Sequence, residues 1–317
     1  MKKATPHRTT PRTSPHRLLW IALAALLALV TACSNTSGGK SPSGTPTPGG
    51  TKAGGTQTPD DSGSDGDDGD DGDDGDDSGA SSKPKAIWRP KLGVDWQWQL
   101  TGKLDMNVKA PVYDIDGFNH PASTVTELHR RGKKVICYIS VGAWEDFRPD
   151  ARRFPKGVIG KDNGWEGERW LDIRKLDVLR PLMAKRFDMC RDKGFDAVEP
   201  DNVDGYLNES GFPLTAKDQL AFNRMIAGLA HERGMSVGLK NDLDQIPELV
   251  KDFDFAVNEQ CAEYDECDTY EPFVEAKKAV FHVEYKLPTD EFCDTTRSLH
   301  LSSLEKKLHL GVWRKTC

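Results

Sequence analysis

A helical stretch that ends in a basic residue and a glycine, followed at once by an apolar strand, recurs three times in this chain. The three pairs that end the helical patterns at 123–131, 177–193 and 215–233 are Arg131-Gly132, Lys193-Gly194 and Arg233-Gly234. A glycine after a basic last turn is the usual stop signal of a helix. The recurrence predicts alternating helices and strands, and therefore a parallel sheet of the α/β class.

Eight strands are expected between and around these helices. They lie near 96–100, 112–116, 134–140, 197–201, 236–241, 254–259, 279–285 and 308–313. Eight strands with interleaved helices over roughly 230 residues fit a single (β/α)8 TIM barrel, which we assign to residues 85–317. A doubly wound open sheet is the alternative. It is disfavoured by the strand count and by the lack of a GxGxxG or P-loop motif.

Residues 1–32 have the pattern of an export signal, with basic residues followed by the apolar run Leu18 to Val30. This run suits a signal peptide and is short for a transmembrane helix. It ends in Val30-Thr31-Ala32-Cys33, which resembles a bacterial lipobox. The resemblance implies cleavage before Cys33, lipidation of its thiol, and anchoring to the outer face of the cell membrane. Ordinary signal cleavage near Ala32 is the alternative.

Residues 33–84 are predicted to be a disordered linker, rich in Ser, Thr, Gly and Pro and then in repeats of Gly-Asp-Asp. Such a segment buries too little apolar surface to offset its ordering entropy. Residues 60–77 hold eleven aspartates and no basic residue, which exceeds the chain's net charge of −7, so the folded part is only mildly acidic. The basic excess of a nucleic-acid-binding protein is missing. A calcium site in the Asp run is a weaker alternative.

The seven cysteines suit an exported protein. Setting Cys33 aside leaves six, which allow 15 pairings. The favoured pairing joins a strand to its neighbouring helix and closes two local loops: Cys137–Cys190, Cys261–Cys267 and Cys293–Cys317. The chain has no CxxC motif and no clustered histidines, so we expect no metal and no organic cofactor.

Polar and aromatic residues gather at the ends of the predicted strands, where a TIM barrel places its active site. Two carboxylates, Glu199 and Asp201, are two residues apart and so point to the same side of their strand, and Glu259 ends a later strand. A pair of carboxylates from separate strands is the minimum requirement for glycoside hydrolysis. Aromatic faces near these ends suit sugar rings. A Schiff base at Lys240 is a weaker alternative, and His282 on its apolar strand is expected to be a core histidine.

Four segments together resemble glycoside hydrolase family 114, which includes endo-α-1,4-polygalactosaminidases. They are residues 135–142 (VICYISVG), 194–206 (GFDAVEPDNVDGY), 238–241 (GLKN) and 258–261 (NEQC). The run Glu199 to Tyr206 is the specific one, and the others support it. The resemblance extends from about Ile87 to Trp313.

The resemblance implies that Asp201 and Glu259 are the catalytic pair, with Asp201 as nucleophile or electrostatic stabiliser and Glu259 as acid/base. It implies an α-1,4-linked galactosamine polymer as substrate, which would be cationic and suited to an acidic barrel end. The expected substrate-binding residues are Trp98, Asp114, Asp116, Tyr138, Glu199, Asn202, Asp204, Tyr206, Lys240, Asn241, Glu284 and Tyr285.

Two other functions stay open on the sequence alone: a glycosidase acting on another α-linked polysaccharide, and a glycan-binding lipoprotein without activity. We expect a monomer whose partners are a polysaccharide and, through Cys33, the membrane, and no nucleic acid.

Overall fold

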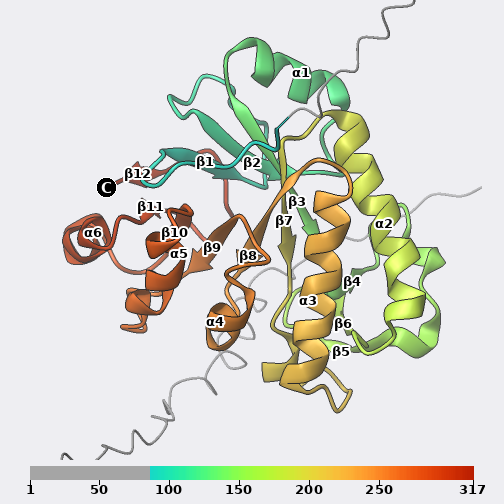
Figure 1. The fold of residues 1–317 in the computed structure, drawn as a ribbon. Coiled ribbons are helices and arrows are strands. Elements are labelled where there is room, and N and C mark those ends of the chain that lie inside the picture. Colours follow the sequence, from blue (N-terminus) through green and yellow to red (C-terminus); the bar gives the residue numbers. More distant parts are fainter. Residues whose placement is uncertain (1–85) are drawn as a thin grey trace, which may run out of the picture. The chain divides into compact units, whose positions relative to one another are not determined.

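The computed structural model describes residues 86–317, and its main feature is a curled, mostly parallel sheet with helices packed around it (Figure 1). The predicted signal peptide, the lipidation site Cys33 and the predicted linker lie outside the described residues. The sheet has the order β1-β2-β3-β7-β8-β9-β10-β11-β12, in which only the last pairing is antiparallel. This arrangement confirms the predicted α/β class and a TIM-barrel-like fold.

The eight parallel strands are β1 Trp96–Gln99, β2 Val112–Asp116, β3 Lys134–Ser140, β7 Ala197–Asp201, β8 Ser236–Lys240, β9 Phe255–Glu259, β10 Val280–Glu284 and β11 Ser302–Glu305. The α-helices are α1 Ala122–Arg130, α2 Leu176–Lys193, α3 Ala216–His231, α4 Ile246–Leu249, α5 Glu271–Glu275 and α6 Thr289–Ser298. Short 3-10 turns lie at Ala151–Arg153, Lys156–Val158, Gly205–Leu207, Leu243–Gln245 and Cys267–Tyr270.

The three predicted helices form within two residues of their expected bounds, because their end signals act locally. Gly132, Gly194 and Gly234 follow α1, α2 and α3 closely and have φ of 72°, 90° and 72°, a left-handed conformation that favours glycine. The start of α3 is fixed by a capping box, in which Thr215 and Asp218 satisfy each other's backbone N–H groups.

The predicted eighth strand at 308–313 is wrong. The strand is β11, Ser302–Glu305, and the apolar run after it crosses the end of the sheet before β12, Lys315–Thr316, returns antiparallel to β11. The apolar composition of 308–313 was misleading, since Leu308 is 58% and Trp313 43% exposed. The polar β11 is buried between β10 and α6 by its position in the fold, which its composition does not indicate.

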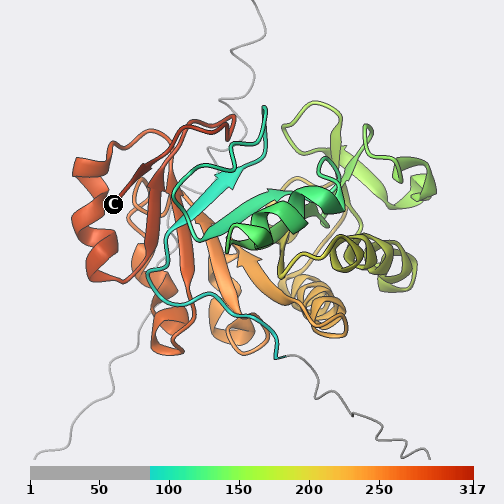
Figure 2. The ribbon, with the colours of Figure 1, turned by 90° about the horizontal axis from the view of Figure 1, so that it is seen from above.

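A three-stranded antiparallel sheet that the sequence did not predict is inserted between β3 and α2. Its strands are β4 Ala143–Glu145, β5 Ile159–Asp162 and β6 Glu168–Leu171, in the order β4-β6-β5. Viewed from above, this inserted sheet and the C-terminal segment lie on opposite sides of the domain (Figure 2). Its backbone is joined to the loop after β7, because Lys161 N–H donates to Ser210 O at 2.9 Å.

Aromatic rings fill the interior of the curled sheet. Trp96 packs on Trp98 and Phe281 with ring centroids 5.7 and 4.6 Å apart, and Phe255 meets Phe281 edge-on at 5.7 Å. The indole N–H of Trp96 also donates to Ser302 O at 2.9 Å, which links β1 to β11. A separate apolar layer lies between the sheet and the helices. This packed interior leaves the strand ends as the place for polar chemistry.

All three predicted disulfides are present. Cys137 of β3 is joined to Cys190 of α2, Cys261 to Cys267 in the loop after β9, and Cys293 of α6 to Cys317. Within the described residues, no helix has the length and apolar character needed to cross a membrane.

Candidate active site

Lys240, at the end of β8, lies at the centre of a cluster of three carboxylates from two neighbouring strands. Its Nζ is 3.1 Å from Glu199 Oε1, 3.1 Å from Asp201 Oδ1 and 3.3 Å from Glu259 Oε2. It also lies 4.7 Å from the ring centroid of Trp98, a cation–π contact. The carboxylates outweigh the effect of burial, so the pKa of Lys240 is raised well above its ordinary value. One permanent ammonium therefore binds all three acids.

Asp201 is held as a carboxylate by three donors. The Tyr138 hydroxyl donates to its Oδ2 at 2.7 Å, Lys240 contacts its Oδ1, and the Asn202 N–H donates to the same oxygen at 2.8 Å. Burial alone would raise its pKa, but the Lys240 charge and these hydrogen bonds outweigh burial and lower the pKa of Asp201. The side chain is 19% exposed, so an incoming molecule can reach it.

Glu259, at the end of β9, is bound by Lys240 on one oxygen and by Tyr285 on the other. The Tyr285 hydroxyl donates to Oε1. The backbone of Glu259 is positioned too, since its N–H donates to the Asn241 side-chain oxygen at 3.0 Å. The Glu259 side chain is 21% exposed, against 3% for Lys240. Asp201 and Glu259 are thus the two lysine-bound carboxylates that face solvent.

Asp114 and Glu199 form a second, deeper layer, and both are completely buried. Burial raises the pKa of Asp114 well above its ordinary value, and the adjacent charge of Glu199 raises it further. Burial also raises the pKa of Glu199, with Lys240 opposing that rise. A protonated Asp114 can donate to Glu199, so the pair shares one proton beneath the exposed acids.

The backbone turns sharply after three of these strands. Asn202, Asn241 and Gln260 directly follow β7, β8 and β9, and have φ of 63°, 47° and 70°. Left-handed non-glycine residues are strained, and they cluster at functional sites. The Ser140 hydroxyl donates to the Asn202 side-chain oxygen at 2.8 Å and holds the first of these turns.

The remaining predicted residues lie around this centre. Asp204 follows β7, and burial together with the charge of Asp201 raises its pKa to about 6. Tyr206 lies in the same loop and is half-buried. Asp116 is buried in an ion pair with Arg148 at 2.8 Å, and its Oδ1 accepts N–H groups of the loop after β2. These contacts favour a role for Asp116 in holding that loop, so its predicted substrate contact remains a prediction.

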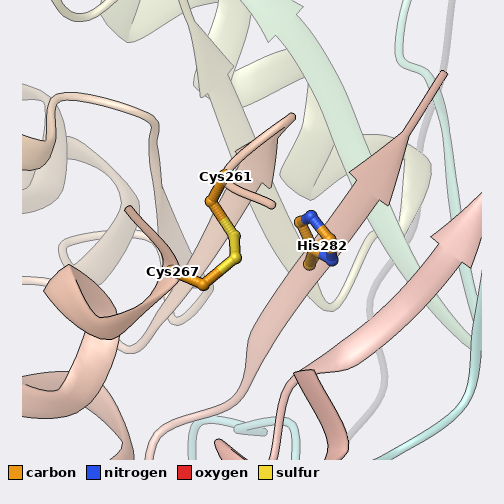
Figure 3. Close-up of side chains that lie close together, drawn as sticks. All are labelled: Cys261, Cys267 and His282. Carbon is orange, nitrogen blue, oxygen red and sulfur yellow. A yellow bond between two sulfur atoms is a disulfide. The ribbon is translucent and has the colours of Figure 1, made fainter. Parts of the chain in front are cut away.

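Glu284 is fully buried at the end of β10. Its Oε1 accepts the Ala262 N–H at 2.8 Å and lies 2.9 Å from His282 Nε2. It therefore ties β10 to the loop after Glu259 instead of facing solvent, and its predicted substrate contact is likewise not established. The sulfurs of Cys261 and Cys267 lie beside His282 (Figure 3).

That group of two cysteines and one histidine has metal-ligand chemistry, with its potential ligand atoms within 4.8 Å of one another. The two sulfurs are bonded to each other, however, and His282 Nδ1 lies 2.9 Å from Ser303 Oγ while Nε2 faces Glu284. The residues as folded thus act as a clamp on the loop after β9, and His282 is a buried histidine as the sequence predicted.

Glu168 is a residue near the site that sequence reasoning missed. It lies on β6 of the inserted sheet, and its charge contributes to the raised pKa of Tyr138. No strand-end pattern could have found it, because the inserted sheet is not part of the barrel repeat. The available signal was Gly-Trp-Glu-Gly-Glu at 164–168, a turn-forming run with acidic and aromatic residues.

The fold and the two partly exposed carboxylates at the strand ends suit a barrel glycoside hydrolase. A family model for glycoside-hydrolase family GH114 matches residues 78–317, and the chain belongs to that family. It is therefore a glycoside hydrolase. No curated protein sequence matches the chain significantly.

The solved structures that are similar to the domain include the following two. Ega3 of Aspergillus fumigatus, whose crystal structure is a complex with galactosamine, is 42% identical with a TM-score of 0.70, covering 74% of this chain and 98% of that one. The glycoside hydrolase domain of PelA from Pseudomonas aeruginosa is 14% identical with a TM-score of 0.56, covering 72% and 99%. The second likeness concerns the fold alone.

Proposed function

We propose that this glycoside hydrolase cleaves α-1,4-linked galactosamine polymers internally, with Asp201 as nucleophile and Glu259 as acid and base. The observation that carries the proposal is the single buried Lys240 that binds two partly exposed carboxylates from different strands. The substrate class is supported by the 42% identity to Ega3, which binds galactosamine in its crystal structure.

The proposed reaction begins with Asp201 ionised and Glu259 protonated. In the first step the carboxylic acid form of Glu259 donates its proton to the glycosidic oxygen. The bond from that oxygen to C1 breaks, and the ionised Asp201 forms an ester with C1. In the second step Glu259 takes a proton from water, whose oxygen attacks C1 and releases Asp201. The Tyr285 hydroxyl can donate to the carboxylate and accept from the acid, so it supports both forms of Glu259.

The distances around Lys240 set an upper limit on the separation of the two carboxylate oxygens that it binds. Its nitrogen is 3.1 Å from an Asp201 oxygen and 3.3 Å from a Glu259 oxygen. The two oxygens are separated by no more than the sum of these distances, which stays below the ~6.5 Å at which the inverting range begins. We propose the retaining course, with a covalent glycosyl intermediate on Asp201.

Binding of a cationic polymer suits the charges at the strand ends. Asp201, Asp204, Glu259 and the partly buried Glu168 all carry carboxyl groups near the exposed part of the site. Tyr138, Tyr206 and Tyr285 supply aromatic groups, and Asn202 and Asn241 supply amides. The predicted substrate contact of Trp98 is wrong, because its side chain is 1% exposed and packs on Trp96 inside the barrel. The proposed anchor at Cys33 and the acidic linker would keep this domain at the outer surface of the cell membrane, tethered by a flexible segment.

The experiment that tests the substrate class is the release of reducing ends by the purified full-length protein from a panel of polymers. We expect rapid release from α-1,4-polygalactosamine, and much slower release from its fully N-acetylated form and from an α-1,4-glucan. A preference for a neutral polymer would contradict the proposed substrate. Release from none of them would favour the glycan-binding alternative.

A further inference from the structure

The inserted sheet brings one acidic side chain, Glu168, to the barrel from outside the barrel repeat. Glu168 and Trp170 lie two residues apart on β6, so their side chains leave the same face of that strand. The ring of Trp170 lies against Gly205, where an added Cβ would be 3.3 Å from a ring carbon. Gly205 belongs to the loop that follows Asp201. The face of β6 that carries Glu168 therefore looks onto the end of β7.

The charged and titratable groups around Glu168 come from three elements. They are Tyr138 of β3, Glu145 and Arg148 at β4, and Asp201 of β7. Burial raises the pKa of Glu168 to about 7. The charges of Glu145 and Asp201 add to this rise, while a 3.0 Å hydrogen bond from the Asn163 amide and the charge of Arg148 oppose it.

Arg148, the one cation among these groups, forms its ion pairs with other carboxylates. It contacts Glu145 at 2.7 Å and Asp116 at 2.8 Å, and all three side chains are buried. Within residues 86–317, no lysine or arginine forms an ion pair with Glu168. Glu168 is half-buried and so remains within reach of solvent. A carboxylate in this position, next to a reactive carboxylate and without a cation, is suited to receive a cation from the substrate.

We propose that Glu168 is a specificity-determining residue that binds the ammonium group of the substrate beside Asp201 and so selects free amino sugars over acetylated ones. The inference rests on the proposed function and names the contact that makes this site prefer a cationic polymer. An acetylated amine has no charge, so it gains nothing from Glu168.

The test compares Glu168→Gln with a matched control, Glu166→Gln. Glutamine keeps the shape and can still accept the Asn163 hydrogen bond, so the change removes only the charge. Glu166 lies two residues away in the same hairpin but is exposed. We expect Glu168→Gln to lower kcat/KM on α-1,4-galactosamine oligomers about tenfold, as loss of one charge-assisted hydrogen bond does. On half-acetylated oligomers the loss should be smaller, and Glu166→Gln should match the unmodified protein on both.

The pH dependence separates substrate contact from a structural role. The ratio of kcat/KM between the unmodified protein and Glu168→Gln should approach one below about pH 6 and rise as Glu168 ionises through about pH 7. Because the contact also needs a protonated amine, the ratio should fall again at the pH where the substrate amine loses its proton. A ratio that is the same at every pH, or equal losses on free and acetylated oligomers, would overturn the inference while leaving the proposed function intact.

Absence of any cleavage by the unmodified protein would instead contradict the proposed function. In that case calorimetry with the same oligomers decides the role of Glu168. Weaker binding of the free amino oligomer to Glu168→Gln alone would support the contact, and equal binding to all three proteins would overturn it.

Discussion

Lys240 determines the charge of the site, because one buried ammonium contacts the carboxylates of Glu199, Asp201 and Glu259. A buried carboxylate without a cation takes up a proton, and Asp114 illustrates this with a pKa raised well above its ordinary value. Lys240 prevents that outcome for Asp201, whose pKa is lowered despite burial. The proposed nucleophile is therefore kept ionised by a neighbour that need not touch the substrate.

Replacing Lys240 with methionine should move the acidic limb of the kcat/KM profile to higher pH. Asp201 acts as a carboxylate, so activity is present above its pKa and is lost as the pH falls through it. Removing the ammonium leaves the effect of burial less opposed and so raises the pKa of Asp201. Lys251→Met, at an exposed position, is the control. An unchanged acidic limb in Lys240→Met would show that the lysine does not set the ionisation of Asp201.

Asp204 should limit stability at neutral and alkaline pH. Its pKa rises to about 6 on folding, so the stabilisation due to its protonated form is full below its unfolded pKa and is lost as the pH rises through about 6. Asp204→Asn removes the charge and should raise the melting temperature at pH 8 but hardly at pH 4. Thermal unfolding at the two pH values measures this. Equal changes at both would mean that Asp204 folds without a pKa shift.

Strand-end residues were the part of the site that the sequence could predict. Because side chains alternate along a strand, Glu199 and Asp201 were expected on one side, and Lys240 contacts both. The deep burial of Asp114 and Glu284 could not be predicted, since it depends on how the loops close over the strand ends. Glu168 could not be predicted as a site residue, because it lies on β6 of the inserted sheet, which is not part of the alternating strand and helix pattern of the barrel.

At the scale of elements, local signals and topology were predictable to different degrees. The C-terminal ends of α1, α2 and α3 are determined by a few neighbouring residues, so the sequence predicted their positions accurately. Strand β11 has the sequence Ser-Ser-Leu-Glu, and only its place between β10 and α6 makes it a buried strand. The inserted sheet lies between β3 and α2 in the chain. The alternating pattern of helices and strands does not predict such an insertion.

The disulfides should differ in what they stabilise. Cys137–Cys190 closes 53 residues and joins β3 to α2, whereas Cys261–Cys267 closes only six in the loop after Glu259. Loop-closure entropy grows with length, so replacing the first pair by alanines should lower the free energy of unfolding by about 2 kcal/mol more than replacing the second. Denaturant unfolding of the two double variants measures the difference. Equal losses would contradict this account.

At the scale of the whole molecule, the barrel collects side chains from distant parts of the chain at one end of the sheet. One connected set of contacts is formed by residues at the ends of four strands and directly after a fifth: Tyr138, Asp201, Lys240, Glu259 and Tyr285. Family GH114 covers the described domain, and the proposed lipid anchor and linker precede it. The central claim is that Asp201 and Glu259 act together at this end of the barrel as the catalytic pair.

The most direct measurement is reducing-end release from α-1,4-polygalactosamine by the unmodified protein, Asp201→Asn and Glu259→Gln. Each variant keeps the size of the side chain and loses only the group that reacts. We expect both to lose at least about a thousandfold in kcat, with unfolding temperatures near that of the unmodified protein. Activity within about tenfold of the unmodified protein in either variant would contradict the assignment of this pair.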